Sequence, residues 1–244
     1  MNSTVNATGM QITAKSDNTF LLISSESTTA SDIQAENGGE GNTSVALTVL
    51  DADSKLYPSA PCMTSAEAGY LTTSDKTVAG LAITTAGVQI TNAATADAYT
   101  NWYTATANGA GSASMKTGSA VQLTSFTGYV IKKTVYLTVA VGANAAKDLS
   151  VTGTFTQKTG GSDVSACRAL ITTNDGDVAK IIDSATPTAD IKGSNTNLTS
   201  SLVRIVNIYL FYDGNNSNVY TNNAANLTGA EISLSFSVNA VPAA

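Results

Sequence analysis

The sequence predicts an all-β protein, a jelly-roll-like antiparallel β-sandwich with a few short helical turns and long loops. Three observations lead to this fold class. Apolar and polar residues alternate at period two, β-branched residues stand where a helix would carry Leu, Glu and Lys, and Gly, Asn and Asp cluster between the alternating segments. Short strands separated by such turns are typical of β-sandwiches.

The clearest alternation lies in the second half of the chain. In "EISLSFSV" (231–238) every second residue is apolar, and "DLSVTGTF" (148–155) repeats the pattern, so each predicts a strand with one wet face. "LVRIVNIYLFY" (202–212) is apolar on both faces, which is typical of a central strand covered on both sides. Further strands are predicted at 19–24, 44–50, 81–90, 133–141 and 164–172.

Helical signals are few. Short helical turns are predicted at 64–71 and at "DVAKIID" (177–183), where Asp177 would cap the first turn. We expect residues 1–9 to form a separate N-terminal strand segment and residues 10–244 to form a single sandwich domain. The less regular stretch from about residue 51 to residue 100 is expected to be an insertion or a small subdomain.

Charge and composition exclude several classes of function. The net charge is −6, whereas nucleic-acid binding requires a basic surface. No apolar run reaches the roughly 18 residues of a membrane-spanning helix. The chain contains no histidine, which removes Ser-His-Asp and Cys-His catalysis and the commonest zinc ligand. We therefore expect no enzymatic activity, no cofactor, no bound nucleic acid and no membrane span.

Two turn sequences contain carboxylate pairs, Asp51/Asp53 and Asp175/Asp177. Such pairs have the side chains for acid–base catalysis, and their oxygen atoms are ligands that Ca²⁺ accepts. However, Asp is ordinary in turns, and neither sequence supplies the roughly six to eight oxygen atoms of a full calcium site. We assign no catalytic residue and no metal ligand.

The two cysteines, Cys62 and Cys167, leave two interpretations open. A disulfide between them would fit an oxidising compartment and would stabilise the fold by closing a long loop. Two buried free thiols that act as small hydrophobic side chains would explain the same residues.

The one tryptophan stands among tyrosines in "DAYTNWYTA". Tyr99, Trp102 and Tyr103 would form an aromatic platform that stacks on sugar rings, or an amphipathic strand that sends Trp102 into the core. The core interpretation is favoured because large aromatic side chains dominate burial. Surface glycans and host ligands are left open.

The first residues change phase. Val5 and Ala7 lie on one face of an extended "NSTVNATGMQITA", whereas after Gly9 the apolar residues Met10 and Ile12 occupy even positions. A slip of one residue at a glycine is typical of a β-bulge or of a break between two strands. The residues before Gly9 and those after it therefore need not belong to the same sheet.

Two hypotheses explain this opening. Either the first strand pairs within its own domain, or the leading segment is a donated strand that completes the sheet of a neighbouring subunit. In the second hypothesis, the polymerisation strand comprises Val5, Ala7, Met10 and Ile12. Because donor and acceptor lie at different places on one subunit, the contact is head-to-tail and produces a fibre.

A resemblance to a known group agrees with the second hypothesis. "MNSTVNATGMQITAKSDNTFLLIS", together with the later "YVIKKTVYLTVA" and "ISLSFSV", resembles the TasA/camelysin group of biofilm-fibre proteins from Gram-positive bacteria. The resemblance implies a jelly-roll fold, polymerisation through an inserted N-terminal strand, and a processed form whose signal peptide has been removed. The chain lacks histidine and any HExxH motif, so no proteolytic role is implied.

The sequence therefore predicts a secreted structural protein, the subunit of a pilus or biofilm-matrix filament that binds copies of itself. Two alternatives remain. One is a monomeric carbohydrate-binding or adhesin module that uses the aromatic residues of 99–103, and the other is a jelly-roll shell protein of a virus.

Overall fold

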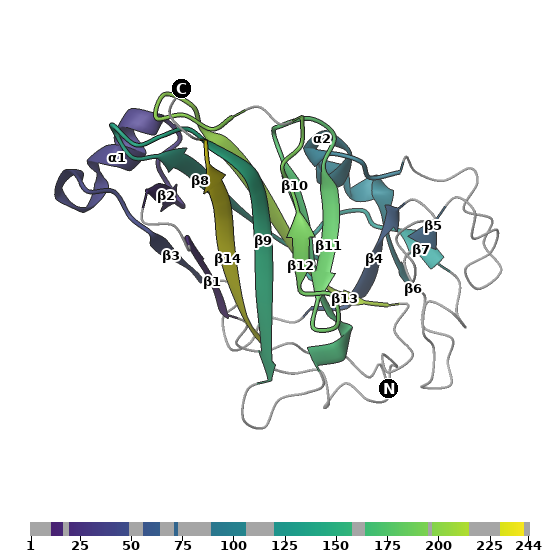
Figure 1. Cartoon of the computed structure of the whole chain (residues 1–244). Helices are drawn as coiled ribbons and strands as arrows, with labels where there is room; N and C mark the ends of the chain where they lie inside the picture. The colour runs from purple at the N-terminus through teal and green to yellow at the C-terminus, as the bar shows by residue number, and fades with distance from the viewer. Residues whose placement is uncertain are drawn as a thin grey trace.

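The chain folds into two facing β-sheets with two short α-helices at their margins (Figure 1). The structure, a computed structural model, describes residues 11–16, 20–48, 56–63, 71–72, 89–105, 120–157, 164–194, 197–214 and 230–241. The predicted all-β sandwich is confirmed.

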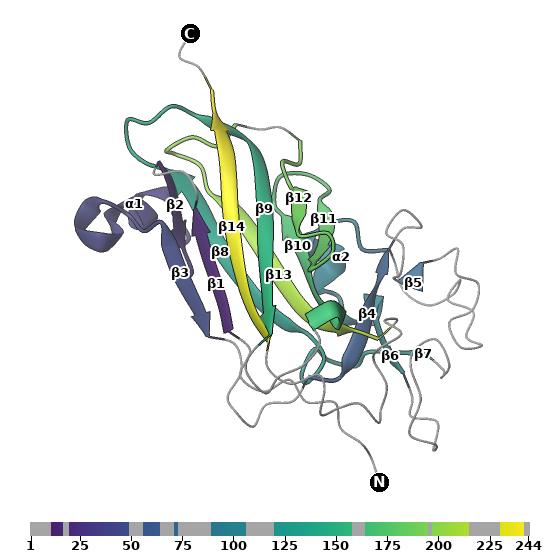
Figure 2. The ribbon, with the colours of Figure 1, turned by 60° about the horizontal axis from the view of Figure 1, so that its bottom comes forward.

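The first sheet, sheet A, has five strands in the order β12-β9-β14-β1-β3. Its bounds are Thr188–Asp190 for β12, Ala146–Gln157 for β9, Ala230–Ala240 for β14, Gln11–Ser16 for β1 and Ser44–Thr48 for β3. Neighbouring strands are antiparallel except β1 and β14, which run parallel, as Figure 2 shows. The first and last strands of the described chain are therefore neighbours in space.

The second sheet, sheet B, has nine strands and is branched. Its central strand β13 pairs with β10 on one side, and with β8 and then β4 on the other. The bounds in sheet B are Leu21–Ser24 for β2, Pro58–Met63 for β4, Leu71–Thr72 for β5, Trp102–Ala105 for β6, Ala120–Gln122 for β7, Ile131–Val139 for β8, Cys167–Thr173 for β10, Ala179–Asp183 for β11 and Arg204–Asp213 for β13.

The main core lies between the two sheets, and the period-two strands build it. In β14 the alternating residues Ile232, Leu234, Phe236 and Val238 are all buried, as the sequence predicts. In β9 the same inward face carries a glycine, Gly153, where an added Cβ would lie 2.9 Å from the Ile182 Cδ1 of the opposite sheet. The sheets are therefore in close contact at this point, and no larger side chain fits without a shift of its neighbours.

A second core covers the outer face of sheet B. It contains Trp102, Leu170, Tyr209 and Phe211 among other residues of 89–130, β10, β11 and β13. The prediction that 202–212 is a central strand covered on both faces is thus confirmed, because β13 directs Ile208 and Leu210 to the main core and Tyr209 and Phe211 to the second. Three aromatic rings surround Trp102, with centroids at 5.2–6.0 Å.

Polar contacts tie the segment around α2 (Ala93–Asp97) to sheet B. The Tyr209 hydroxyl donates to Asp97 Oδ1 at 2.7 Å, and Lys132 Nζ contacts the same oxygen at 2.5 Å. Burial, with the neighbouring Asp97 carboxylate, raises the pKa of Tyr209 far above its usual value. The phenol therefore stays protonated and keeps donating this hydrogen bond.

One of the two predicted helical turns is wrong. The segment 177–183 is not a helical turn but contains strand β11, and Asp177 accepts a hydrogen bond from Asn92 Nδ2 rather than capping a helix. Most of the turn expected at 64–71 and most of the strand expected at 81–90 lie outside the described residues, and Leu71 belongs to strand β5. Val141, expected to continue the alternation of β8, lies beyond its end and is 78% exposed.

Two helices were not predicted. The α-helix α1 spans Ala30–Gly39 with a kink in its last residues, and its cap Thr29 accepts from the Asp32 backbone N–H. The helix α2 is capped by Asn92, whose side chain and that of Thr95 form a reciprocal capping box. Short 3₁₀ turns lie at Tyr99–Asn101 and Val164–Ala166. Within the described residues, no helix is both long and apolar enough to cross a membrane.

Replacing Trp102 by Ala tests the second core. We expect the substitution to lower the free energy of unfolding by about 3–5 kcal/mol, because it empties a fully buried site that three rings surround. Urea denaturation followed by circular dichroism measures the loss. Tyr99→Ala, at a 44% exposed position, is the control and should change stability by less than about 1 kcal/mol. Equal effects of the two substitutions would contradict the assignment.

Candidate functional site: the N-terminal strand and the edge beside it

The N-terminal strand β1 fills an interior position of sheet A. It pairs parallel to β14, with Ile12 opposite Ile232, and antiparallel to β3, with Ile12 opposite Leu47. An interior strand satisfies backbone groups on both of its neighbours. Without β1, therefore, both β14 and β3 would present unpaired backbone groups.

The side chains of β1 explain its register. Ile12 and Ala14 point inward and are fully buried in the main core, where Ala14 lies opposite Leu234 and Val45. On the outer face, Thr13 Oγ1 donates to Ser233 Oγ at 3.0 Å. A slip of one residue would exchange the two faces and bury the threonine. The alternation of buried and outer side chains in β1 and its backbone pairing therefore specify the same register.

The structure describes only one residue of the expected polymerisation strand. Ile12 belongs to β1 and packs in the core of its own chain, whereas Val5, Ala7 and Met10 lie outside the described residues. The phase change at Gly9 therefore falls just before the first described strand, which begins at Gln11.

Strand β3 forms one edge of sheet A as far as the described residues define the sheet. Among the described residues, β3 pairs with β1 alone. The segment Ser44–Thr48 contains no charged residue and no proline, and its register with β1 is unbroken. Charges, prolines and bulges are the means by which proteins protect edge strands from pairing with other chains. β3 has none of these protections.

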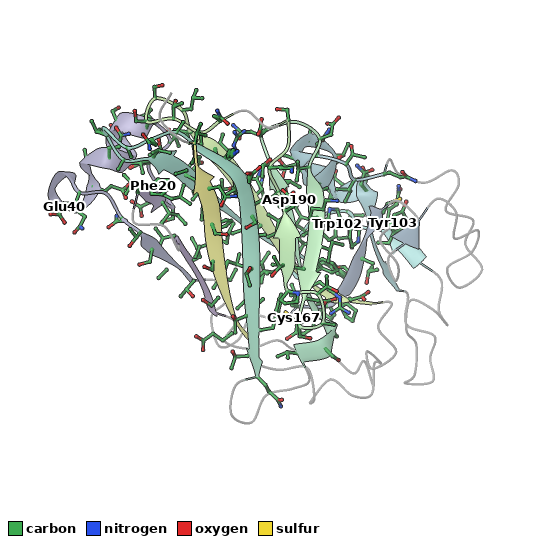
Figure 3. The ribbon with its side chains drawn as sticks, viewed as in Figure 1. Phe20, Glu40, Trp102, Tyr103, Cys167 and Asp190 are labelled. Atoms are coloured by element: carbon green, nitrogen blue, oxygen red, sulfur yellow. The ribbon has the colours of Figure 1, made fainter. Side chains whose placement is uncertain are left out.

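The nearest edge of sheet B, at β2, is covered by the chain itself. The Ile23 backbone N–H donates to the Asn42 carbonyl at 2.8 Å, so the segment after α1 occupies the side of β2 that faces away from β8. Gly41 permits this close approach, since its φ is +71° and an added Cβ would lie 2.6 Å from Leu22 Cδ1. Figure 3 shows Phe20 and Glu40 on this side of the molecule.

Side chains of α1 hold this cover in place. Glu36 accepts hydrogen bonds from Ser24 Oγ at 2.6 Å and from Asn42 Nδ2 at 2.7 Å. Burial alone would raise the pKa of Glu36, but hydrogen bonds from Ser24, Ser27 and Asn42 hold it below its usual value. Gln34 Nε2 donates to the carbonyls of Val139 and Ser200, which fixes the helix to the end of β8.

The opposite edge of sheet A is protected. Strand β12 has only three residues, follows Pro187 and ends with Asp190, which forms an exposed ion pair with Lys192 at 3.4 Å. A short strand with a proline and charges is a poor template for another chain. The edge strand β11 likewise carries Lys180 and Asp183.

Of the carboxylates considered for catalysis or calcium, the two that the structure describes, Asp175 and Asp177, have structural partners. Asp175 is 5% exposed and lies 3.0 Å from Arg204 Nη1, and Ser194 Oγ donates to it at 2.5 Å. Asp177 accepts a hydrogen bond from Asn92, and Asp51 and Asp53 lie outside the described residues. The described residues contain no group of three or more His, Cys, Asp or Glu side chains placed to hold a metal ion.

The aromatic platform is not formed by the residues proposed for it. Trp102 and Tyr103 are fully buried, and Trp102 Nε1 donates to the Ala96 carbonyl at 2.9 Å. Only Tyr99 of the three is exposed. Figure 3 places Trp102 and Tyr103 together on the side of the molecule opposite α1. The favoured core interpretation of Trp102 is thus the one that the structure shows.

The cysteines are free thiols in the structure, so the disulfide considered between them is not formed. Cys62 lies on β4 and Cys167 on β10, and both are fully buried. Burial raises the pKa of the Cys167 thiol to about 12 and also raises that of Cys62. Both side chains therefore stay protonated and act as small hydrophobic residues.

Comparison with known proteins adds no assignment, since no family model, no curated protein and no solved structure matches the chain. The function must therefore be argued from the strand β1 and the two edges of sheet A.

Replacing Ile12 by Ala tests the importance of β1 to its own sheet. We expect a loss of about 2–5 kcal/mol in the free energy of unfolding, because the side chain is fully buried between Ile232 and Leu47. Thermal and urea unfolding measure the loss. The neighbouring substitution Thr13→Ala removes only an outer-face hydrogen bond and should cost about 1 kcal/mol. A negligible effect of Ile12→Ala would mean that β1 is not docked as described.

Replacing Asp175 by Ala tests the structural role of the carboxylate. The change leaves Arg204 buried without this partner carboxylate, which costs about 3–5 kcal/mol of stability. Asp177→Ala, at an exposed turn position, is the control and should have a small effect. Adding Ca²⁺ should leave the melting temperature of the unmodified protein unchanged. A rise in melting temperature with Ca²⁺ that Asp175→Ala abolishes would instead establish a metal site.

Proposed function

We propose that this chain is the structural subunit of an extracellular filament, a pilus or biofilm-matrix fibre. In this proposal the segment of residues 1–9 pairs with a sheet of the next subunit, and repetition of this contact builds a head-to-tail homopolymer. The subunit is secreted and requires no cofactor.

The observation that carries the proposal is the junction between the leading segment and β1. From Gln11 onward the chain occupies an interior position of its own sheet, with Ile12 and Ala14 in the core. The alternation of Val5 and Ala7 is out of phase with that of β1. A segment that alternates but does not continue the phase of β1 is suited to pairing elsewhere.

The surface of sheet A agrees with a polymer that persists outside cells. Its outer face consists largely of small hydroxyl side chains, which interact across strands, as in the contact of 2.7 Å between Ser150 Oγ and Ser237 Oγ. Hydroxyl groups do not titrate between acidic and neutral pH, so such a face keeps its hydrogen bonds when the medium changes. The described outer-face residues on β9 and β14 are Ser150, Thr152, Thr154, Thr156, Ser233, Ser235 and Ser237.

The alternative of a carbohydrate-binding module loses its main support. Its platform required Trp102 and Tyr103 at the surface, and both are fully buried. The viral shell protein stays an alternative that imaging separates, since a shell protein forms closed particles.

Deleting residues 1–8 tests the proposal. The deletion leaves β1 intact, so the subunit should fold with an unchanged circular dichroism spectrum and nearly unchanged stability. Negative-stain microscopy should show filaments for the full chain and only monomers for the deletion. Filaments from the shortened chain, or closed particles from the full chain, would contradict the proposal.

A matched pair of substitutions refines this experiment. Val5→Asp with Ala7→Asp places two charges on the apolar face of the leading segment, whereas Thr4→Asp with Asn6→Asp places the same charges on its polar face. We expect the first pair to abolish filaments and the second pair to retain them. Sedimentation of the polymer gives the comparison quantitatively. Equal behaviour of the two pairs would show that the alternation of the segment plays no role.

A further inference from the structure

We propose that the acceptor for the leading segment is the outer edge of β3, and that a second copy of the chain provides the segment. Residues 4–8 of one subunit would add a sixth strand to sheet A of another, antiparallel to Ser44–Thr48. This inference rests on the proposed function and names the partner surface within it.

We choose β3 as the acceptor because the other strand edges are covered, charged or short. The margin of sheet B at β2 is occupied by the segment at Asn42, and the margins at β12 and β11 carry charges, with Pro187 beside β12. The remaining end strands of sheet B, β7 and β5, have only three and two residues and are too short to be good templates. β3 has five residues without a charge, a proline or a bulge. Strand addition takes place where a row of backbone N–H and C=O groups is available, and no described strand pairs with the outer side of β3.

The side chains of β3 match those of the leading segment. Leu47 points inward and is 5% exposed, and Val45 is partly buried against the same core, while Ser44 and Ala46 are exposed on the outer face. In the leading segment Val5 and Ala7 alternate in the same way with Thr4, Asn6 and Thr8. Antiparallel pairing that places Asn6 opposite Ala46 brings Val5 to Leu47 and Ala7 to Val45.

The short connection between residues 8 and 11 favours a leading segment from another copy over the segment of the same chain. Gln11 lies opposite Thr48, so β1 occupies the inner side of β3. To reach the outer side, residue 8 of the same chain would have to lie two strand spacings from residue 11, about 9.5 Å. Three residues span at most about 10–11 Å when fully extended. The connection would therefore have to be almost straight, and it would also have to pass around the end of β3.

The direction of the strands leads to the same conclusion. A segment that turned back from β1 within one chain would run antiparallel to β1 and hence parallel to β3. The antiparallel arrangement, which is slightly more stable per residue, is open only to a segment that arrives from another copy.

Cysteine cross-linking tests this inference in the full-length protein. In the variant Asn6→Cys/Ala46→Cys, both new thiols lie on the outer face, and directly opposed positions are close enough for a disulfide. The native cysteines are buried and remain unreactive during mild oxidation. We expect a ladder of dimers, trimers and higher multimers on non-reducing gels, which collapses to monomer on reduction.

Two controls locate the contact. Asn6→Cys/Thr188→Cys places the acceptor thiol at the exposed outer face of β12, the protected edge, and Asn6→Cys alone has no designed acceptor. Neither control should give more than a faint dimer band. A ladder from the β12 variant, or a monomer with an internal disulfide from the β3 variant, would overturn the inference.

The outcomes separate the inference from the proposed function. If microscopy shows filaments but the β3 variant gives no cross-link, the filament stands and the acceptor edge is wrong. If the β3 variant cross-links only to a dimer and no filament forms, the edge is correct and the contact closes reciprocally, so the filament function is wrong.

A substitution within β3 provides an independent readout. Val45→Lys directs a charge inward at a partly buried edge position, a common protection of natural edge strands. We expect it to abolish multimers while the monomer still shows a cooperative thermal transition. Thr188→Lys on β12 is the control and should leave assembly unchanged. Normal assembly of a folded Val45→Lys variant would overturn the inference.

Discussion

The parallel pairing of β1 with β14 is the interaction on which sheet A depends. It joins residues near the two ends of the described chain, for example Gln11 with Glu231, and β3 in turn pairs only with β1 among the described strands. Without β1, three strands would remain paired as β12-β9-β14, and the core would lose Ile12 and Ala14. A contact between residues so distant in sequence closes a long loop, so we expect it to form late in folding.

The interior position of β1 also determines which strand lies at the edge of sheet A. Because β1 is an interior strand, the edge of sheet A in the described chain is the next strand, β3. The helix α1 and the segment after it cover the neighbouring edge at β2. The cover depends on polar contacts made by Glu36 and Gln34 and on the positive φ of Gly41. Among the described residues, the edge at β2 is therefore covered, whereas the outer side of β3 has no strand partner, although the two strands lie on the same side of the sandwich.

The alternation of apolar and polar residues correctly predicted those strands whose buried faces it records directly. The strands β9, β13 and β14 were predicted because strict alternation, or apolar residues on both faces, records which faces are buried. Strand β11 was misread because Val178, Ile181 and Ile182 have the spacing of a helix face, and pairing with β10 overrides that signal. The helix α1 was missed because its sequence resembles a turn, although Thr29 and Asp32 offered a cap. The position of β3 at the edge of the described sheet depends on the pairing of β1 with β14, in which Thr13 and Ser233 are 220 positions apart, and no local pattern contains this information.

The phase change at Gly9 gives the proposed assembly a simple physical basis. If the donated strand were β1 itself, each subunit would have to break two ladders and expose Ile12 and Ala14 before it accepted the strand of a neighbour. Addition at β3 requires no such opening, because β1 stays in its own sheet and the new strand pairs with the outer side of β3, where no described strand pairs. Donation of β1 would thus couple polymerisation to partial unfolding and make it slow. Addition of a separate segment allows the subunit to fold first and assemble afterwards, and the two processes then depend on different residues.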